Sequence, residues 1–192
     1  MTFDKVNSPK QLMQFLDENI NYGVIDKDGN IYNDSSSDNF QKVCFTDWQT
    51  KDIKSIISSG IGHCYDQVEI QRQWFCDNGY KVYTFWISAY QESITNSGFS
   101  HTYLVYQQGG KFYYFEHADC CNKGIYQFDS LLDAVKFQAN NQIKYATSCI
   151  KPKDKYSVCI KLFDEPPIGL DMMGYLDFVN SCKDYNIDLY KK

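Results

Sequence analysis

Apolar residues at helical spacing dominate the first third of the chain. They predict three helices, over residues 9–22, 51–59 and 64–77. Ser8 and Thr50 are the expected N-caps of the first two helices, because a side-chain oxygen there can accept a backbone N–H. Gly60 and Gly79 are expected to end the second and third helices, since glycine readily adopts the left-handed conformation that follows a helix. The polar run at 34–39 is expected to form a loop.

Alternating apolar and polar positions dominate the middle of the chain. They predict strands over residues 80–87, 101–107, 111–117 and 156–162. A tight two-residue turn at either Gln108-Gly109 or Gly109-Gly110 is expected to join the second and third strands, and 91–100 is expected to be a loop. Helical patterns follow at 128–141 and after Asp171. With no repeat or linker in view, residues 1–192 are expected to form a single α+β domain.

The composition narrows the class of protein. Hydrophobic residues are 43% and charged residues 22%, as in globular proteins. The net charge of −5 and the lack of a basic cluster argue against nucleic-acid binding and against an anionic membrane surface. No stretch of about 18 apolar residues and no secretory signal at 1–11 are found. We therefore expect a cytoplasmic protein without a cofactor, whose eight cysteines are reduced.

Cys64 is the candidate nucleophile. It follows the glycine-rich turn at 60–62 and begins the third predicted helix. The free N–H groups and the dipole at a helix start favour an anion. Such a position lowers the pKa of a thiol from about 8.5 to about 3.5–7.5. The alternative is an inert buried thiol, because cysteine is among the most buried residue types.

His101 and Glu116 are the candidate partners of Cys64. A tight turn at 108–110 pairs odd positions of the first strand with even positions of the second. Glu116 then lies on the same face as His101, directly opposite or one step diagonal, within about 8 Å. Glu116 can accept a hydrogen bond from one ring nitrogen of His101 and leave the other nitrogen for the thiol. A slip of one residue in the pairing would place His117 there instead.

These motifs resemble the transglutaminase-like branch of the papain-like thiol enzymes. The resemblance lies in Gly62-His63-Cys64 at a helix start, in the segment 77–82, in 101–106 and in 111–114. It covers roughly the third of the chain between residues 60 and 119. It implies a papain-like α+β fold, with N-terminal helices and a catalytic cysteine at a helix start packed on an antiparallel sheet.

The family order of cysteine, histidine and aspartate implies a triad here. The matching positions are Cys64, His101 and Glu116, the acid lying fifteen positions after the histidine. Three features depart from the family. The third member is glutamate, Thr102-Tyr103 replaces the aromatic pair that often follows the histidine, and no calcium-site cluster or large extra domain is present. The last departure favours a small hydrolase over a protein-crosslinking enzyme.

The resemblance implies a thiol-dependent hydrolase or acyl transferase. Its substrate would be a peptide, a protein glutamine side chain or a small amide, processed through a thioester on Cys64. The backbone N–H of Cys64 is one expected oxyanion donor. Trp48 and Gln49 are the candidates for the second donor.

Three other functions remain open at this stage. The chain could be a catalytically inactive binding module on the same fold. It could be a zinc-binding protein that uses His117, Cys120 and Cys121, because imidazole and thiolate suit zinc. It could also be a deamidase or acyltransferase that acts on a protein partner.

Overall fold

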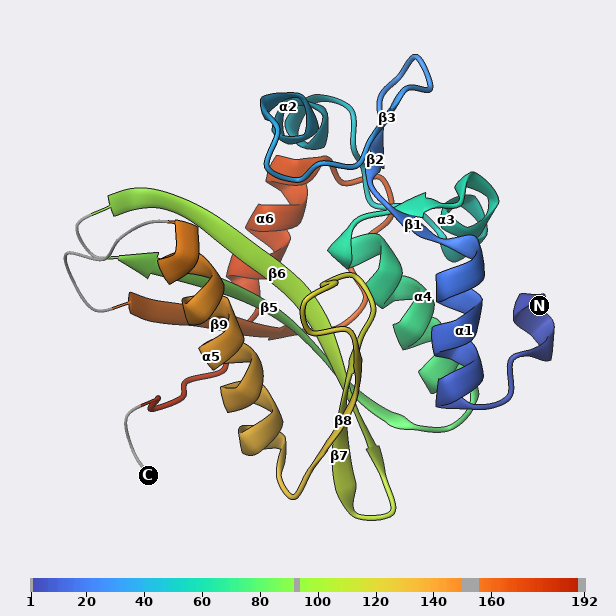
Figure 1. Cartoon of the computed structure of the whole chain (residues 1–192), viewed down its shortest axis with the longest axis vertical. Coiled ribbons are helices and arrows are strands. Elements are labelled where there is room, and N and C mark those ends of the chain that lie inside the picture. The colour runs from blue at the N-terminus through green and yellow to red at the C-terminus, as the bar shows by residue number, and fades with distance from the viewer. Residues whose placement is uncertain (1, 92–93, 150–155, 190–192) are drawn as a thin grey trace.

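The computed structural model describes residues 2–91, 94–149 and 156–189. In these residues the chain is an α+β fold of six α-helices and a six-stranded antiparallel sheet (Figure 1). The strands lie in the order β10-β9-β5-β6-β7-β8. Their bounds are β5 Lys81–Gln91, β6 Ile94–Gln108, β7 Lys111–Glu116, β8 Gly124–Phe128, β9 Tyr156–Phe163 and β10 Lys183–Asp184.

The helices lie before, within and after the strand region. They are α1 Pro9–Asn19, α2 Asp38–Thr46, α3 Ile53–Ser59, α4 Cys64–Asp77, α5 Leu131–Cys149 and α6 Met172–Ser181, after a short 3-10 helix at Phe3–Lys5. Two small ladders accompany them. The first pairs β1 (Asn21–Tyr22) with β4 (Ile61–Gly62) in parallel, and the second pairs β2 (Val24–Ile25) with β3 (Ile31–Tyr32) as a hairpin.

The helix ends follow the sequence signals only in part. Helix α1 ends at Asn19 and not at 22, because residues 21–22 form β1, and α5 does not span 128–141, because residue 128 ends β8. Ser8 caps α1, and Gly60 ends α3 in the left-handed conformation at a φ of 67°, both as predicted. Thr50 was wrongly assigned as the cap of α3. That role belongs to Asp52, whose carboxylate accepts the N–H of Ser55, whereas the Thr50 hydroxyl donates to a backbone carbonyl 117 residues away.

The polar segment at 34–39 was wrongly expected to be a loop throughout. Its last two residues begin α2, with Ser37 as the N-cap. Phe40, Val43 and Cys44 form the buried face of this helix. The helix is short and carries only one apolar stripe, so its polar start resembles a loop.

The two longest strands replace the loop expected at 91–100. The pairing of β5 with β6 continues past Ser88↔Ser100 to Ala89↔Phe99, so residues 94–100 belong to β6. Residues 92–93 of the expected loop lie outside the described residues. His101 is therefore inside a strand and not at its start, and it pairs with Ile87.

The hairpin of β6 and β7 has the predicted register. Gln108 pairs with Lys111 across Gly109 and Gly110, whose φ angles of 57° and 77° require glycine-like freedom. Leu104 pairs with Phe115, which confirms that odd positions of one strand meet even positions of the other.

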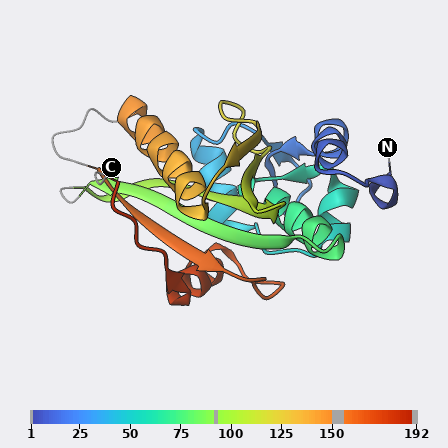
Figure 2. The same cartoon turned by 90° about the horizontal axis from the view of Figure 1, so that it is seen from below.

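The sheet has a packed layer on each face. α5 and α6 lie on opposite sides of it (Figure 2). Tyr103 and Val105 of β6 belong to the core formed with α5, and Leu104 and Tyr106 belong to the core formed with α1 and α4. This alternation is the expected result of the two-residue period of a strand. Among the helices of the described residues, none is both long and apolar enough to cross a bilayer.

Candidate active site

Cys64 begins helix α4, as predicted. The parallel pairing of β1 with β4 sets Tyr22 beside Gly62, two residues before the thiol. Gly62 has no room for a side chain, because a Cβ there would lie 2.8 Å from the Cβ of Asp66. Cys64 itself is partly exposed. The other thiols that the structure shows as free are those of Cys44, Cys76, Cys120, Cys121, Cys159 and Cys182. The glycine therefore permits a tight entry into α4 that leaves the thiol accessible.

His101 and Glu116 meet on one face of the β6–β7 hairpin. The Nε2 atom of His101 lies 2.7 Å from Oε2 of Glu116, in the diagonal relation that the sequence predicted. Glu116 is only 2% exposed. Its Oε2 also accepts the hydroxyl of Tyr114 at 2.7 Å, and its Oε1 accepts the N–H of Asp119 at 2.9 Å. The carboxylate therefore leaves Nδ1 as the ring nitrogen of His101 that can serve Cys64.

The electrostatics of the site favour a thiolate–imidazolium pair. Burial alone would raise the pKa of Cys64. Hydrogen bonding from His101, the charges of His63 and His101, and the backbone N–H of Thr102 outweigh burial and lower this pKa to about 7. Burial opposes the charge on His101, but the charge of Glu116 and the hydrogen bond with Cys64 raise the pKa of His101 well above its ordinary value. A nucleophile and its proton donor are thus both charged near neutral pH.

The carboxylate of Glu116 is the third charged group of the site. Burial tends to raise the pKa of Glu116, and the charge and hydrogen bond of His101, with the N–H of Asp119 and the Tyr114 hydroxyl, lower it overall. Glu116 is accordingly ionised at neutral pH. It holds the ring of His101 in one orientation and stabilises its protonated form.

His117, directly after β7, links the end of this strand to the first turns of α4. Its Nδ1 lies 2.5 Å from Oε1 of Gln67, and its Nε2 lies 3.0 Å from Oδ1 of Asp17. Gln67 in turn donates to the carbonyl oxygen of Gly62 at 2.9 Å. Glu116 and His117 are consecutive, so one side chain faces His101 while the next anchors the helix that carries the cysteine. The alternative pairing, with His117 in place of Glu116, does not occur.

The zinc set suggested by the sequence is not assembled. Among the described residues, the metal-type ligands that come within 4.8 Å of one another are those of Asp119, Cys120 and Cys121, without His117. Both nitrogens of His117 are already occupied by Gln67 and Asp17. The carboxylate of Asp119 also accepts the N–H of Cys121 at 2.9 Å, as it does in an ordinary turn.

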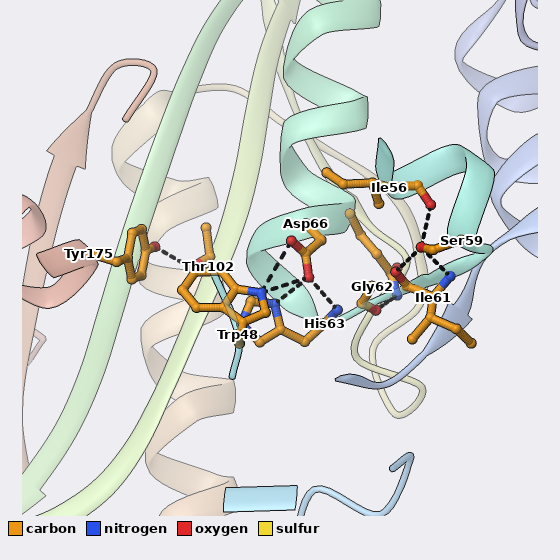
Figure 3. Close-up of polar contacts among 10 residues, drawn as sticks. Trp48, Ile56, Ser59, Ile61, Gly62, His63, Asp66, Thr102 and Tyr175 are labelled. Atoms are coloured by element: carbon orange, nitrogen blue, oxygen red, sulfur yellow. Dashed lines mark hydrogen bonds and ion pairs between the residues drawn. The ribbon is translucent and has the colours of Figure 1, made fainter. Parts of the chain in front are cut away.

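Trp48 and Gln49 were the candidates for the second oxyanion donor, and the indole of Trp48 lies against Asp66. Trp48 is 2% exposed, and its one donor, Nε1, points at Asp66, 3.2 Å from Oδ2 (Figure 3). Gln49 is exposed, and its backbone forms a bridge with Asp171. The indole N–H of Trp48 is therefore directed at Asp66 and not at Cys64.

Two groups near Cys64 escaped the sequence analysis. The first is the backbone N–H of Thr102, which helps to lower the pKa of Cys64. The second group is Tyr22, where burial and the nearby charge of Cys64 raise the pKa of the phenol well above its ordinary value, so it stays protonated. No local signal marks either group, because both approach Cys64 through pairings between distant segments.

Comparisons with protein families, with curated proteins and with solved structures found no match for this chain. The resemblance to the transglutaminase-like enzymes therefore stays a prediction made from motifs. The arguments for a function rest on the geometry of the site and on its charges.

Proposed function

We propose that this protein is a thiol-dependent hydrolase or acyl transferase that acts on an amide through a thioester on Cys64. One observation carries the proposal. The pKa of Cys64, at the start of α4, is lowered by His101, and the Nε2 atom of His101 lies 2.7 Å from the buried carboxylate of Glu116. Nucleophile, base and orienting acid in this order are the components of a catalytic triad. We also propose that the fold is papain-like, with a transglutaminase-like core.

The first half-reaction forms the thioester. The thiolate of Cys64 attacks the carbonyl carbon of the amide, a C–S bond forms, and the electron pair of the carbonyl moves onto its oxygen. The His101 imidazolium then gives its proton to the amide nitrogen, the C–N bond breaks, and the amine leaves. For a glutamine side chain the leaving amine is ammonia. Glu116 keeps the ring of His101 oriented throughout.

The second half-reaction releases the acyl group. His101, now neutral, takes a proton from water, and the water oxygen attacks the thioester carbonyl. The C–S bond breaks, which returns the thiolate and the imidazolium and frees a carboxylic acid. A bound amine in place of water gives a new amide, so the same site performs acyl transfer.

Two donors serve the developing oxyanion in this proposal. The backbone N–H of Cys64 lies in the first turn of α4, where N–H groups lack helical partners. The phenol of Tyr22 is the second, because the β1–β4 pairing sets it beside Gly62 and it remains protonated. This assignment replaces Trp48, whose indole N–H is committed to Asp66.

Labelling with a panel of acyl electrophiles tests the proposal. The panel contains nitrophenyl esters, peptide amides and glutamine-containing peptides, and the modified residue is mapped by mass spectrometry. We expect one acyl adduct, on Cys64, that disappears with time as water resolves it. Labelling spread over the exposed thiols of Cys76, Cys120 and Cys121, with none on Cys64, would support an inactive binding module.

A further inference from the structure

A second histidine lies against the start of α4 and has no place in the triad. His63 immediately precedes Cys64 and is 6% exposed. Its Nδ1 is buried without a hydrogen-bond partner of good geometry and lies within ion-pair distance of Asp66, 3.1 Å from Oδ2. Its ring packs on Trp48, with the two ring centroids 4.6 Å apart (Figure 3). This buried imidazole and its carboxylate partner need an explanation.

Asp66 is a buried carboxylate whose cationic partner is His63. It is 2% exposed and accepts the backbone N–H of His63 at 3.1 Å and the Nε1–H of Trp48 at 3.2 Å. Among the ion pairs of the described part of the chain, none gives it a lysine or an arginine. Buried charges are normally paired, so an ionised Asp66 favours a protonated His63.

We propose that His63 is a positioning residue for the reaction: Asp66 keeps it protonated, and its charge stabilises the thiolate of the adjacent Cys64. The inference rests on the proposed function, because a stabilised thiolate matters only to a nucleophile. Burial opposes the charge on His63, but the charge and the hydrogen bond of Asp66 raise its pKa overall, with a further contribution from Cys64. In turn, the charge of His63 lowers the pKa of Cys64.

The other groups around this pair are neutral. Burial raises the pKa of the surrounding phenols and of the nearest thiol well above neutrality, to about 12 for Cys44. Glu69, one turn further along α4, is paired with Arg72. The neutral groups that face the His63–Asp66–Trp48 cluster or Cys64 are Tyr22 from β1, Cys44 from α2, Tyr65 from α4 and Tyr175 from α6. Among the residues that the structure describes, the acidic side chain within ion-pair distance of His63 is that of Asp66.

Helix capping does not explain the histidine. His63 occupies the N-cap position of α4, where serine, threonine, aspartate and asparagine are the preferred residues. Asparagine can cap the helix and cannot carry a positive charge. The substitution His63→Asn therefore removes the charge and keeps the capping function, which separates the two roles.

The pH dependence of Cys64 alkylation measures the effect. Iodoacetamide reacts with the thiolate, and mass mapping of the Cys64 peptide isolates its rate from those of the other cysteines. In His63→Asn we expect the pKa of Cys64 to rise by about one unit, a roughly tenfold lower rate at pH 6. Lys111→Gln removes a charge at the far end of the β6–β7 hairpin and should leave the profile unchanged. An unchanged profile in His63→Asn overturns the inference.

A second pair of variants tests the role of Asp66. In an Asp66→Asn background His63 loses its anion and becomes neutral above about pH 6.5, so His63→Asn should add no further shift. If His63→Asn raises the pKa of Cys64 equally in the wild-type and the Asp66→Asn proteins, the role of Asp66 is overturned. The imidazole resonances of the wild-type protein give a check that needs no variant, because the pKa of His63 should lie above its ordinary value of about 6.5. Titration of His63 below pH 6.5 contradicts the inference.

The outcome separates this inference from the proposed function. A wild-type Cys64 that titrates like a free thiol, with a profile that His101→Ala does not alter, contradicts the proposed function. A lowered wild-type pKa that depends on His101 and persists in His63→Asn overturns only the role of His63.

Discussion

Replacing Glu116 with glutamine is the sharpest perturbation of the site. The carboxylate accepts hydrogen bonds at both oxygens, from His101 and Tyr114 at Oε2 and from the N–H of Asp119 at Oε1. An amide has an acceptor at one end and only donors at the other. Whichever way the amide of Glu116→Gln is oriented, its NH2 group replaces one carboxylate oxygen. The NH2 group then faces either His101 and the Tyr114 hydroxyl or the N–H of Asp119, which are themselves donors. The variant therefore loses the negative charge and at least one hydrogen bond.

The expected loss follows from the strength of that interaction. A hydrogen bond to a charged group contributes about 1.5–3 kcal/mol, and each 1.36 kcal/mol of barrier is a factor of ten in rate. If the bond to His101 acts fully in the transition state, Glu116→Gln should slow acylation of Cys64 about 10- to 150-fold. The loss should be smaller than in Cys64→Ala or His101→Ala, because the nucleophile and the proton donor remain.

The assay is the second-order rate of Cys64 acylation by an activated ester, read by mass spectrometry. Glu69→Gln is the matched control, since Glu69 is also a buried glutamate, 4% exposed, and bonds Arg72 at 2.8 Å outside the triad. Both variants should lower the free energy of unfolding, but only Glu116→Gln should slow acylation. Equal acylation rates in the two variants would refute the role assigned to Glu116.

Three further predictions follow from the same geometry. Cys64→Ala and His101→Ala should abolish acyl turnover and keep the native circular dichroism spectrum; residual turnover in either would move the chemistry elsewhere. Because the pKa of Cys64 is lowered to about 7, its contribution to stability is complete above the ordinary thiol pKa and is lost as the pH falls through about 7. The difference in urea stability between wild type and Cys64→Ala should therefore grow from pH 6 to pH 9, and a constant difference would argue against the lowered pKa. Gly62→Ala should cost about 1–3 kcal/mol, because its Cβ would lie 2.8 Å from that of Asp66; an unchanged urea midpoint would mean that the turn has room.

The pairing of His101 with Glu116 could be predicted because it depends on local rules. Side chains on a strand alternate, and the glycine pair at 109–110 limits the turn to two residues. These two facts determine which positions share a face. The position of Cys64 at a helix start is equally local, since Gly79 and the apolar spacing mark the helix.

The long strand pair shows where local rules fail. Residues 94–100 are rich in Ser, Asn and Gly, which suggests a loop, yet they continue β6 because β5 pairs with them. Strand formation depends on the neighbouring strand more than on intrinsic preference. Long-range contacts also explain why Asp52, and not Thr50, caps α3. The Thr50 hydroxyl donates to the carbonyl of Pro167 and accepts the N–H of Leu170, far along the chain.

The groups that surround the thiol of Cys64 also could not be predicted from the sequence. Trp48 was a reasonable oxyanion candidate by position, but its N–H points at a carboxylate that lies eighteen residues later. Tyr22 comes beside Gly62 through a two-residue parallel ladder that no periodicity reveals. The direction of a buried donor depends on such long-range packing, so a sequence can suggest the residue and not its partner.

Alkylation of Cys64 at pH 6, compared between wild type and His101→Ala, tests the thiolate–imidazolium pair most directly. With a pKa of about 7 the wild-type thiol is about 10% ionised at that pH, against about 0.3% for a free thiol with a pKa near 8.5. We predict that the wild-type rate exceeds the His101→Ala rate by up to roughly 30-fold, the ratio of these two fractions, and by less where His63 still lowers the pKa of Cys64 in the variant. Equal rates in the two proteins would contradict the pairing of Cys64 with His101, and the proposed chemistry with it.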